Sequence, residues 1–310
     1  MKLKLICGAL ALCCTALVSG CGDKNSGITL RLAQASAADG AIGISLDNFA
    51  KEVNEKSNGR ITVLTFHNGQ LGSERENIES VQMGDLDMAV VNQSVLVNFL
   101  PQVAVFDLPY TITSAEHADK VRLHGFSIWE SGFRNLTNSK KDINSVDDVQ
   151  GLRIRVMENK IHQELWMALG ADPVPMSWSD AYTGMQQGAI DGQENPATVI
   201  DKNNVVEVNK HMAVTEHCYS TVYILFSPKI WNKLSKEDQD LLNECMRKAE
   251  VDERALSRQM DKEAITTLQS KGMTVTYPDK TGFIEKSAKV RETYGSNFKA
   301  MLDRIAALAK

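Results

Sequence analysis

Two arginines on one predicted strand carry the clearest chemical signal in this 310-residue sequence. Arg153 and Arg155 alternate with apolar residues over 152–156, so both side chains point to the same face of a strand. A guanidinium makes two parallel hydrogen bonds to a carboxylate and stays charged at any working pH. Periodicity alone does not separate the two residues, and both could be solvated edge arginines. Arg155 is the better candidate for holding an organic acid, because it lies at the carboxyl end of the strand, where open α/β sheets place ligands.

Enzyme motifs are absent from the sequence. It contains no Gly-x-Ser-x-Gly, Gly-x-Gly-x-x-Gly or Cys-x-x-Cys pattern. The histidines lack the four-residue helical spacing of a zinc-binding helix, and they are His67, His117, His124, His162, His211 and His217. His217 beside Cys218 could pair a base with a nucleophile, but adjacent strand residues point to opposite faces. We therefore expect a binding protein without catalysis, cofactor or metal, and an exported hydrolase is the less favoured alternative.

Strands and helices alternate along the chain. Hydrophobic periodicity predicts strands over 28–33, 60–66 and 88–91 and helices over 42–56 and 74–84. A second set follows, with a strand over 152–156, a helix over 160–169, an extended segment over 173–175, and a helix that begins with a capping-box pattern at 177–180 and ends near 188. This alternation predicts an α/β fold with mostly parallel sheets.

One very long helix is predicted near the C-terminus, over about 236–271. Ser235 begins a capping pattern, and no Gly or Pro interrupts the chain before Gly272. About 35 residues at ~1.5 Å each give a helix about 50 Å long, which exceeds the diameter of one lobe. Charged residues interrupt the heptads that a coiled coil would need. We expect the helix to bridge two lobes.

Chain length also indicates two lobes, since about 290 residues after the leader exceed the usual size of one core. The predicted lobe I comprises 28–132 plus 221–260, and the predicted lobe II comprises 133–220 plus 261–310. The long helix crosses from one to the other.

The N-terminus resembles an export signal. Lys2 and Lys4 precede an apolar run over 5–18, which is too short to span a membrane, and Ser19-Gly20-Cys21 follows. Residues 1–20 are therefore predicted to be a lipoprotein signal peptide, with Cys21 as the lipid-bearing residue and 21–27 as a tether. An ordinary cleaved signal or a retained anchor is the alternative. The predicted location is periplasmic or at the cell surface, anchored to a bacterial membrane.

Charge and cysteine content exclude further classes. The formal net charge is −5, and no basic tract recommends nucleic acid as a partner. Beyond the leader only Cys218 and Cys245 remain, which implies no disulfide framework. The two could pair in an oxidising compartment, but Cys245 stands in a helical pattern beside apolar residues, so burial as a small core residue is favoured. The protein is expected to be a monomer.

Five segments together resemble the solute receptors of tripartite ATP-independent periplasmic (TRAP) transporters. They are NGQLGSER at 68–75, FDLPY at 106–110, GLRIRV at 151–156, GADPVPMSWS at 170–179 and DGQENP at 191–196. The resemblance runs from about residue 28 to the end. It implies a two-lobed fold like that of periplasmic binding proteins, capture of a C4-dicarboxylate or a sugar acid such as a hexuronate by hinge closure, and delivery to the membrane subunits of a transporter.

The resemblance also implies a set of ligand-binding residues. Arg155 matches the arginine that holds the substrate carboxylate, and Arg134 matches a second arginine that faces the ligand, although it could instead pair with a neighbouring acid. Asn195 matches a cleft amide, with helix capping as its alternative, and Trp178 matches an aromatic wall, with core packing as its alternative. Five further residues occupy segments that line the family's cleft: Tyr219, Asn92, Glu74, Gln34 and Glu158.

Glu158 bears most directly on ligand choice. If it faces inward, it repels a second carboxylate and accepts hydrogen bonds from sugar hydroxyls, so a sugar acid is favoured over a plain dicarboxylate. A structural lipoprotein would need no ligand cleft. The receptor of an ATP-driven transporter is closer in composition, but the long helix and the segment at 191–196 favour the TRAP type.

Overall fold

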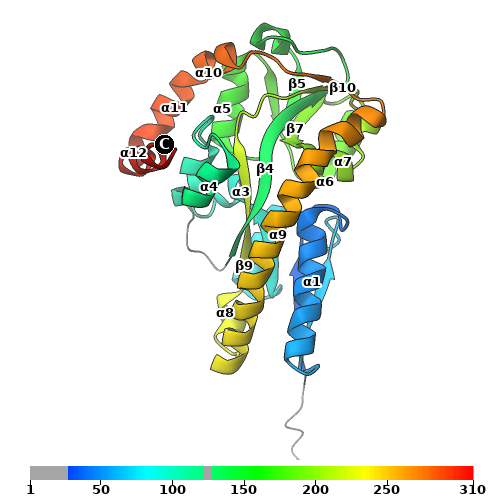
Figure 1. The fold of residues 1–310 in the computed structure, drawn as a ribbon, viewed down its shortest axis with the longest axis vertical. Helices are drawn as coiled ribbons and strands as arrows, with labels where there is room; N and C mark the ends of the chain where they lie inside the picture. The colour runs from blue at the N-terminus through cyan, green and yellow to red at the C-terminus, as the bar shows by residue number, and fades with distance from the viewer. Residues whose placement is uncertain (1–26, 122–126, 310) are drawn as a thin grey trace, which may run out of the picture.

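The computed structural model describes residues 27–121 and 127–309 of the chain. Two α/β bodies lie end to end and share their central strands (Figure 1). The predicted leader, Cys21 and most of the tether lie outside the described residues. Within the described part, no helix is long and apolar enough to cross a membrane.

Three parallel strands and two helices form the N-terminal body. They are β1 (Ile28–Ala33), α1 (Ala41–Lys56), β2 (Ile61–Phe66), α2 (Glu74–Met83) and β3 (Met88–Asn92). β1 lies between β2 and β3 and runs parallel to both, so the predicted βαβαβ unit is confirmed.

The C-terminal body repeats the alternation. Its elements are β5 (Arg153–Val156), α5 (Lys160–Leu169), β6 (Asp172–Pro175), α6 (Trp178–Gln186), β7 (Gly192–Pro196), α7 (Ala197–Lys202), β8 (His211–Ala213) and β10 (Thr274–Thr276). β5 is parallel to β6 and β7. The strand and helices predicted over 152–188 are therefore present. One local detail differs: the Ser177 hydroxyl donates to the Asp180 carboxylate at 2.6 Å, and its side chain makes no capping bond to the helix backbone.

Two long antiparallel strands join the bodies. β9 (Tyr219–Phe226) pairs with β3 of the N-terminal body, and β4 (Ser127–Asn138) pairs with β7 and β8 of the C-terminal body. β4 and β9 pair with each other, and their register shifts between Glu130 and Gly132. The main path of the sheet is β2-β1-β3-β9-β4-β7-β5-β6, so one sheet passes through both bodies.

The predicted long helix is confirmed as α9 (Lys236–Ser270), 35 residues long. Ser235 caps it by accepting a hydrogen bond from the Asp238 backbone N–H. Its first half packs on α1 through Leu242 and Met246, and its second half buries Leu268 in the core of the C-terminal body beside α7 (Figure 1). The helix thus spans both bodies, as its length predicted.

The remaining helices are short and lie at several places around the two bodies (Figure 1). They are α3 (Gln93–Leu96), η1 (Pro101–Asp107), α4 (Ala115–Val121), α8 (Pro228–Trp231), α10 (Thr281–Lys286), α11 (Ala288–Gly295) and α12 (Lys299–Leu308), with short turns η2 (Val146–Val149), η3 (Val205–Glu207) and η4 (Ser296–Phe298). α12 packs on α4 and on the end of η1, since Leu108 and Ile305 share one core cluster and the His117 ring lies 2.8 Å from the Ile305 carbonyl oxygen. This contact joins residues of both predicted lobes, whose boundaries stay a prediction. The two cysteines of the described chain, Cys218 and Cys245, are free and buried.

Candidate functional site

A cleft lies where the two bodies meet, and we call it the central cleft. It holds about 430 Å³ of open space, including its mouth, which is within the range of small-molecule sites. Its walls come from the N-terminal body, the C-terminal body and the shared strands: Ala35, Ser36, Ile42, Glu74 and Asn92; Arg155, Met157, Trp178, Asn195 and Val199; Ser131, Arg134 and Val222. Six of the nine predicted ligand residues therefore line one cleft.

Arg155 presents a buried guanidinium to this cleft. The residue is 2% exposed, and its Nε donates to the Met176 carbonyl oxygen at 2.8 Å. No other described residue makes a hydrogen bond or ion pair with this guanidinium, and its Cζ lies 5.6 Å from the centre of the Trp178 ring. Burial lowers the pKa of Arg155 to about 10. A buried cation with free donors in a cleft is suited to binding an anion.

Arg134 is also buried, but an acid neutralises it. Its Nε and one terminal nitrogen donate to the two carboxylate oxygens of Glu194, at 2.5 and 2.9 Å. The His217 ring lies 3.0 Å from the same carboxylate. Burial alone would raise the pKa of Glu194, but Arg134 and His217 hold it far below its usual range. The alternative of an acid partner is thus realised for Arg134, although its side chain still lines the cleft.

Glu74 and Asn92 bring acceptors from the N-terminal body. The Asn92 backbone N–H donates to Glu74 at 2.7 Å, and its side-chain amide donates to the Ser220 hydroxyl at 2.8 Å. Burial raises the pKa of Glu74, even though the Asn92 N–H acts in the opposite direction. Glu74 places a carboxyl group near Arg155, which limits how much negative charge a ligand can bring into the cleft.

Asn195 and Trp178 complete the opposite wall. The Asn195 side-chain amide donates to Gln193 at 2.6 Å. It does not cap α7, whose N-cap is Pro196 with no side-chain bond. Trp178 begins α6 and is partly buried against the core of the C-terminal body, so it packs on the core and also lines the cleft.

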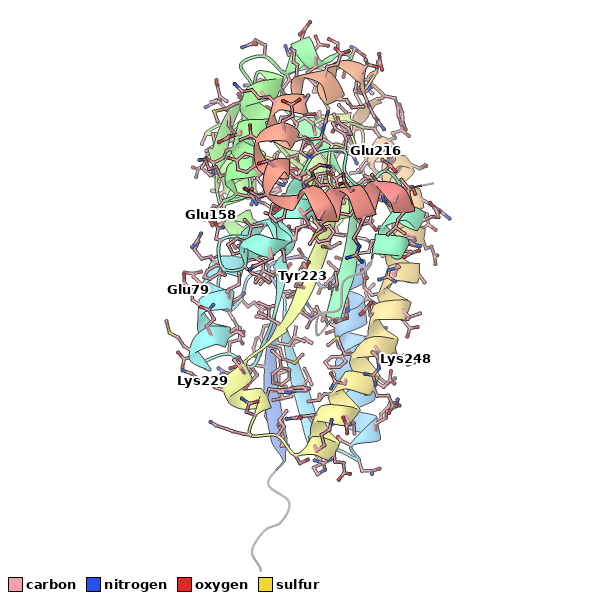
Figure 2. All side chains as sticks on the ribbon, turned by 90° about the vertical axis from the view of Figure 1, so that its left-hand side faces the viewer. Glu79, Glu158, Glu216, Tyr223, Lys229 and Lys248 are labelled. Carbon is pink, nitrogen blue, oxygen red and sulfur yellow. The ribbon has the colours of Figure 1, made fainter. Side chains whose placement is uncertain are left out.

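The other three predicted residues lie elsewhere. Glu158 lines a smaller side cavity that shares Glu74, Arg155 and Trp178 with the central cleft, and it sits near the junction of the bodies in Figure 2. Gln34 is buried just before the cleft residue Ala35, with its side-chain nitrogen 2.6 Å from the His67 ring. Tyr219 lies on the other face of β9, edge-on to Phe133 with ring centres 5.0 Å apart.

Several residues of the site were not singled out from the sequence. Ser131 precedes Arg134 on β4, and Val222 alternates with Tyr219 on β9. Glu194 stands inside the DGQENP segment, next to Asn195, and only its acidic side chain could have indicated a partner for Arg134.

Arg153, the other arginine of the predicted strand, makes an ion pair at the surface, with Asp191 at 2.8 Å.

One buried group has the residue types of a metal site. Ligand atoms of Asp107, His162 and Cys218 lie within 4.8 Å of one another. The Asp107 carboxylate, however, already accepts hydrogen bonds from side chains of Gln93, Ser94 and Asn159. A filled hydrogen-bond network explains this group without an ion.

Two bodies that share their strands, enclose a cleft and aim a buried arginine into it define a two-lobed solute receptor. A family model described as bacterial extracellular solute-binding protein, family 7 (DctP), matches residues 32–297. The chain belongs to this family and is a TRAP-type solute receptor, a class that is periplasmic and not enzymatic.

Individual relatives support the assignment to this family. A solute-binding protein of Verminephrobacter eiseniae is 34% identical over 295 residues, which cover 89% of this chain and 88% of that protein. The crystal structure of a TRAP solute-binding protein from Polaromonas sp. JS666, bound to D-erythronate, matches with a TM-score of 0.86 and 33% identity over 91% of this chain and 98% of that one. A Roseobacter denitrificans receptor with bound L-galactonate matches with a TM-score of 0.85 and 30% identity over 90% of this chain and 98% of that one.

Proposed function

We propose that this receptor captures a sugar acid with a single carboxylate, an aldonate or a hexuronate, and delivers it to the membrane permease of a TRAP transporter. The observation that carries the proposal is the charge pattern of the central cleft. Arg155 has free guanidinium donors, whereas Arg134 is already neutralised by Glu194. The cleft therefore offers one guanidinium whose terminal nitrogens are free to bind a carboxylate.

The carboxylate of the ligand would accept hydrogen bonds from the terminal nitrogens of Arg155. Nε is held by the Met176 carbonyl, which fixes the plane of the guanidinium, and the Trp178 ring covers it. A rigid fork loses little conformational freedom on binding, so a bidentate bond there is favourable.

The rest of the ligand would meet polar groups that suit hydroxyls. Ser131, Asn92 and Asn195 can each donate or accept a hydrogen bond, and Glu74 can accept one. A second carboxylate would instead approach Glu74 and the neighbouring Glu158, which repel it. The acids bound to two related structures, D-erythronate and L-galactonate, support this choice.

Capture would proceed by closure of the two bodies on the ligand. Both bodies contribute residues to the cleft, so a bound acid stabilises the closed form. Ion pairs already bridge the bodies at 3.7 Å between Arg75 and Glu158 and at 3.5 Å between Lys202 and Asp39. The closed receptor would then dock on the membrane subunits.

We further propose that lipidation of Cys21 anchors the receptor to a bacterial membrane. The support is the sequence alone, in which Val18-Ser19-Gly20 precedes Cys21 after an apolar run.

A thermal-denaturation screen of the protein without residues 1–21 tests the ligand proposal. The panel contains erythronate, galactonate, glucuronate, galacturonate, succinate and malate. A ligand at ~100 times its Kd stabilises by about 2.7 kcal/mol, which raises Tm by a few degrees at this chain length. We expect a shift with one or more sugar acids that Arg155→Ala abolishes. A shift in Tm with succinate or malate alone would contradict the single-carboxylate assignment. If no acid of the panel shifts Tm, even after unfolding, dialysis and refolding have removed any copurified ligand, the proposal that the receptor binds an organic acid would be contradicted.

A further inference from the structure

A second pocket adjoins the central cleft, and we call it the junction pocket. It holds about 370 Å³ of space, including its mouth. Its walls come from the segment before α1 and the first turn of α1, from α7, and from β4 and α9. Ser36, Ile42, Ser131 and Val199 line both the junction pocket and the central cleft. These four residues belong to both bodies and the shared strands, so the two spaces meet where the bodies meet.

Two buried hydroxyls in the junction pocket have no hydrogen-bond partner in the described parts of the chain. They belong to Ser131, which is 7% exposed, and Thr198, which is 8% exposed. Ser131 is the extra residue of the bulge in β4, where the register shifts between Glu130 and Gly132. Buried hydroxyls usually have a partner, so these two are suited to polar atoms of a ligand.

The first turn of α1 adds backbone donors to the junction pocket. Its N-cap is Gly40, which has no side chain to cap the helix, and the first turn contains no acid. The first N–H groups of a helix have no acceptor within the helix. Those of Ala41 and Ile42 also find no acceptor elsewhere among the described residues, and both residues line the pocket. The pocket thus combines free hydroxyls with free N–H groups.

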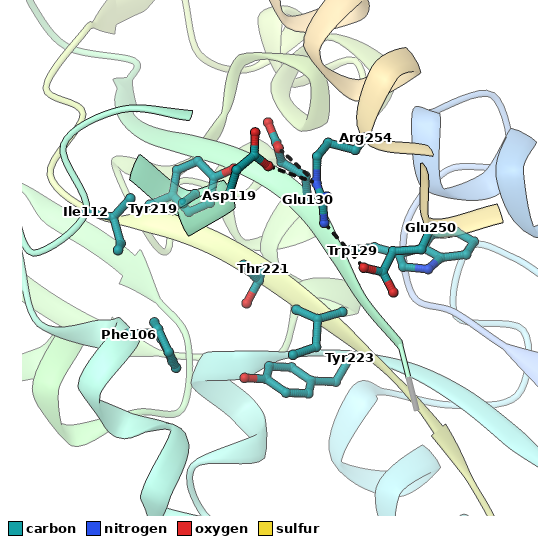
Figure 3. Close-up of a pocket in the computed structure, with 12 residues that line it drawn as sticks. Phe106, Ile112, Asp119, Trp129, Glu130, Tyr219, Thr221, Tyr223, Glu250 and Arg254 are labelled. Atoms are coloured by element: carbon teal, nitrogen blue, oxygen red, sulfur yellow. Dashed lines mark hydrogen bonds and ion pairs between the residues drawn. The ribbon is translucent and has the colours of Figure 1, made fainter. Parts of the chain in front are cut away.

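The charged side chains of the junction pocket are already paired. Lys202 lies 3.5 Å from Asp39, an ion pair between the two bodies. The Glu130 carboxylate accepts a hydrogen bond from Arg258 at 3.0 Å, and it lies 3.8 Å from Arg254 in a separate cavity on the opposite face of the shared strands (Figure 3). Hydroxyl groups of a ligand therefore suit the junction pocket better than a second carboxylate does.

We propose that the junction pocket holds the hydroxyl-bearing end of a six-carbon sugar acid whose carboxylate is bound by Arg155. Arg155 lines the central cleft but not the junction pocket, so the pocket lies away from the end of the cleft that binds the carboxylate. A chain of six carbons would reach the free hydroxyls and N–H groups there, whereas a chain of four carbons would stay within the central cleft. This inference rests on the proposed function and adds selection by chain length to it.

Acids of two chain lengths test the proposal by isothermal titration calorimetry on the protein without residues 1–21. Galactonate and gluconate have six carbons, and erythronate and threonate have four. The tighter six-carbon acid should bind at least about tenfold more tightly than the tighter four-carbon acid, because it forms additional hydrogen bonds in the junction pocket. Equal affinity for the two lengths, or a preference for four carbons, would overturn the inference.

Variants of Thr198 locate the effect, because this residue lines the junction pocket but not the central cleft. Thr198→Val keeps the size of the side chain and removes the hydroxyl. It should weaken binding of the six-carbon acid by about 2- to 10-fold and leave binding of the four-carbon acid within about twofold of wild type. The matched control Thr266→Val makes the same change at an exposed threonine of α9 and should leave both affinities unchanged. An unchanged affinity for the six-carbon acid in Thr198→Val, or an equal loss for both lengths, would also overturn the inference.

Arg155→Ala separates this inference from the proposed function, since it should weaken binding of both chain lengths. If the acids bind through Arg155 but chain length has no effect on affinity, only the inference about the junction pocket fails. If no acid binds, or if Arg155→Ala leaves binding unchanged, the proposed function fails and the inference fails with it.

Discussion

Replacement of Arg155 by alanine should separate ligand affinity from the stability of the unliganded protein. The residue is 2% exposed, and one bond from Nε to Met176 is its only hydrogen bond to the described residues. Truncation of one partner of a buried charge pair costs about 2 to 5 kcal/mol. The affinity for the acid should therefore fall by between about 30-fold and about 4,000-fold.

The unliganded protein should respond very differently. The lowering of the Arg155 pKa to about 10 by burial corresponds to roughly 3 kcal/mol against the charged form. The guanidinium nevertheless stays protonated at neutral pH, so this unfavourable energy is present before any acid binds. Its removal offsets the cavity that alanine leaves, and Tm of the unliganded protein should change by only a few degrees.

Titration calorimetry with the best acid of the panel measures the loss of affinity, and thermal denaturation without ligand measures stability. Arg155→Lys keeps the charge but loses the fork, so it should also bind poorly. Arg153→Ala is the matched control from the same strand. It breaks the ion pair with Asp191, so it should lower Tm but leave the affinity within about threefold of wild type. Wild-type affinity in Arg155→Ala would refute the reasoning.

Three further predictions concern selectivity, pH and anchoring. Glu74→Gln removes an acid beside Arg155 but keeps an acceptor for the Asn92 N–H, so competition calorimetry should show a gain of at least about tenfold for succinate relative to the preferred sugar acid; an unchanged ratio would exclude Glu74 as the selecting charge. The folded-state pKa of Glu253 is raised to about 8, above the ordinary glutamate value near 4.3, so the folded state binds the extra proton and the free energy of unfolding should fall as pH rises from about 5 to about 8. Glu253→Gln should remove that decline, on the order of 3 to 5 kcal/mol at pH 8 in urea denaturation, and parallel pH profiles for the two proteins would contradict it. Cys21→Ser should abolish labelling by a radioactive fatty acid and leave acid binding unchanged, whereas continued labelling would exclude Cys21 as the lipidated residue.

Local signals predicted most element boundaries. The expected strand over 28–33 matches β1, and the long helix expected over 236–271 matches α9 (Lys236–Ser270). Gly84 and Gly170 end α2 and α5 in left-handed conformations, with φ of 83° and 100°, which glycine adopts without strain. Helix caps, terminal glycines and hydrophobic periodicity depend on residues that are close in the sequence. The boundaries that they set can therefore be predicted from one sequence.

The arrangement of the site depends on contacts that are distant in the sequence. Arg134 meets Glu194 because β4 pairs with β7, with Leu136 opposite Glu194 in the register, and His217 reaches the same carboxylate from a third segment. Nothing local predicts that register. The sequence also does not determine which face of β9 meets the cleft. Alternation shows only that Tyr219 and Val222 point in opposite directions.

The position of β9 in the sheet has a consequence for how the chain is made. β3 ends at Asn92, but its antiparallel neighbour β9 begins only at Tyr219, so one edge of the N-terminal sheet has no partner until most of the chain has emerged. Pairings this distant in sequence form slowly, and an open strand edge can pair with other chains in the meantime. A newly synthesised chain of this design therefore cannot complete its first body early. A long-lived unfolded state is hazardous in a crowded cell, but it is the state in which a polypeptide can be threaded through a narrow export channel.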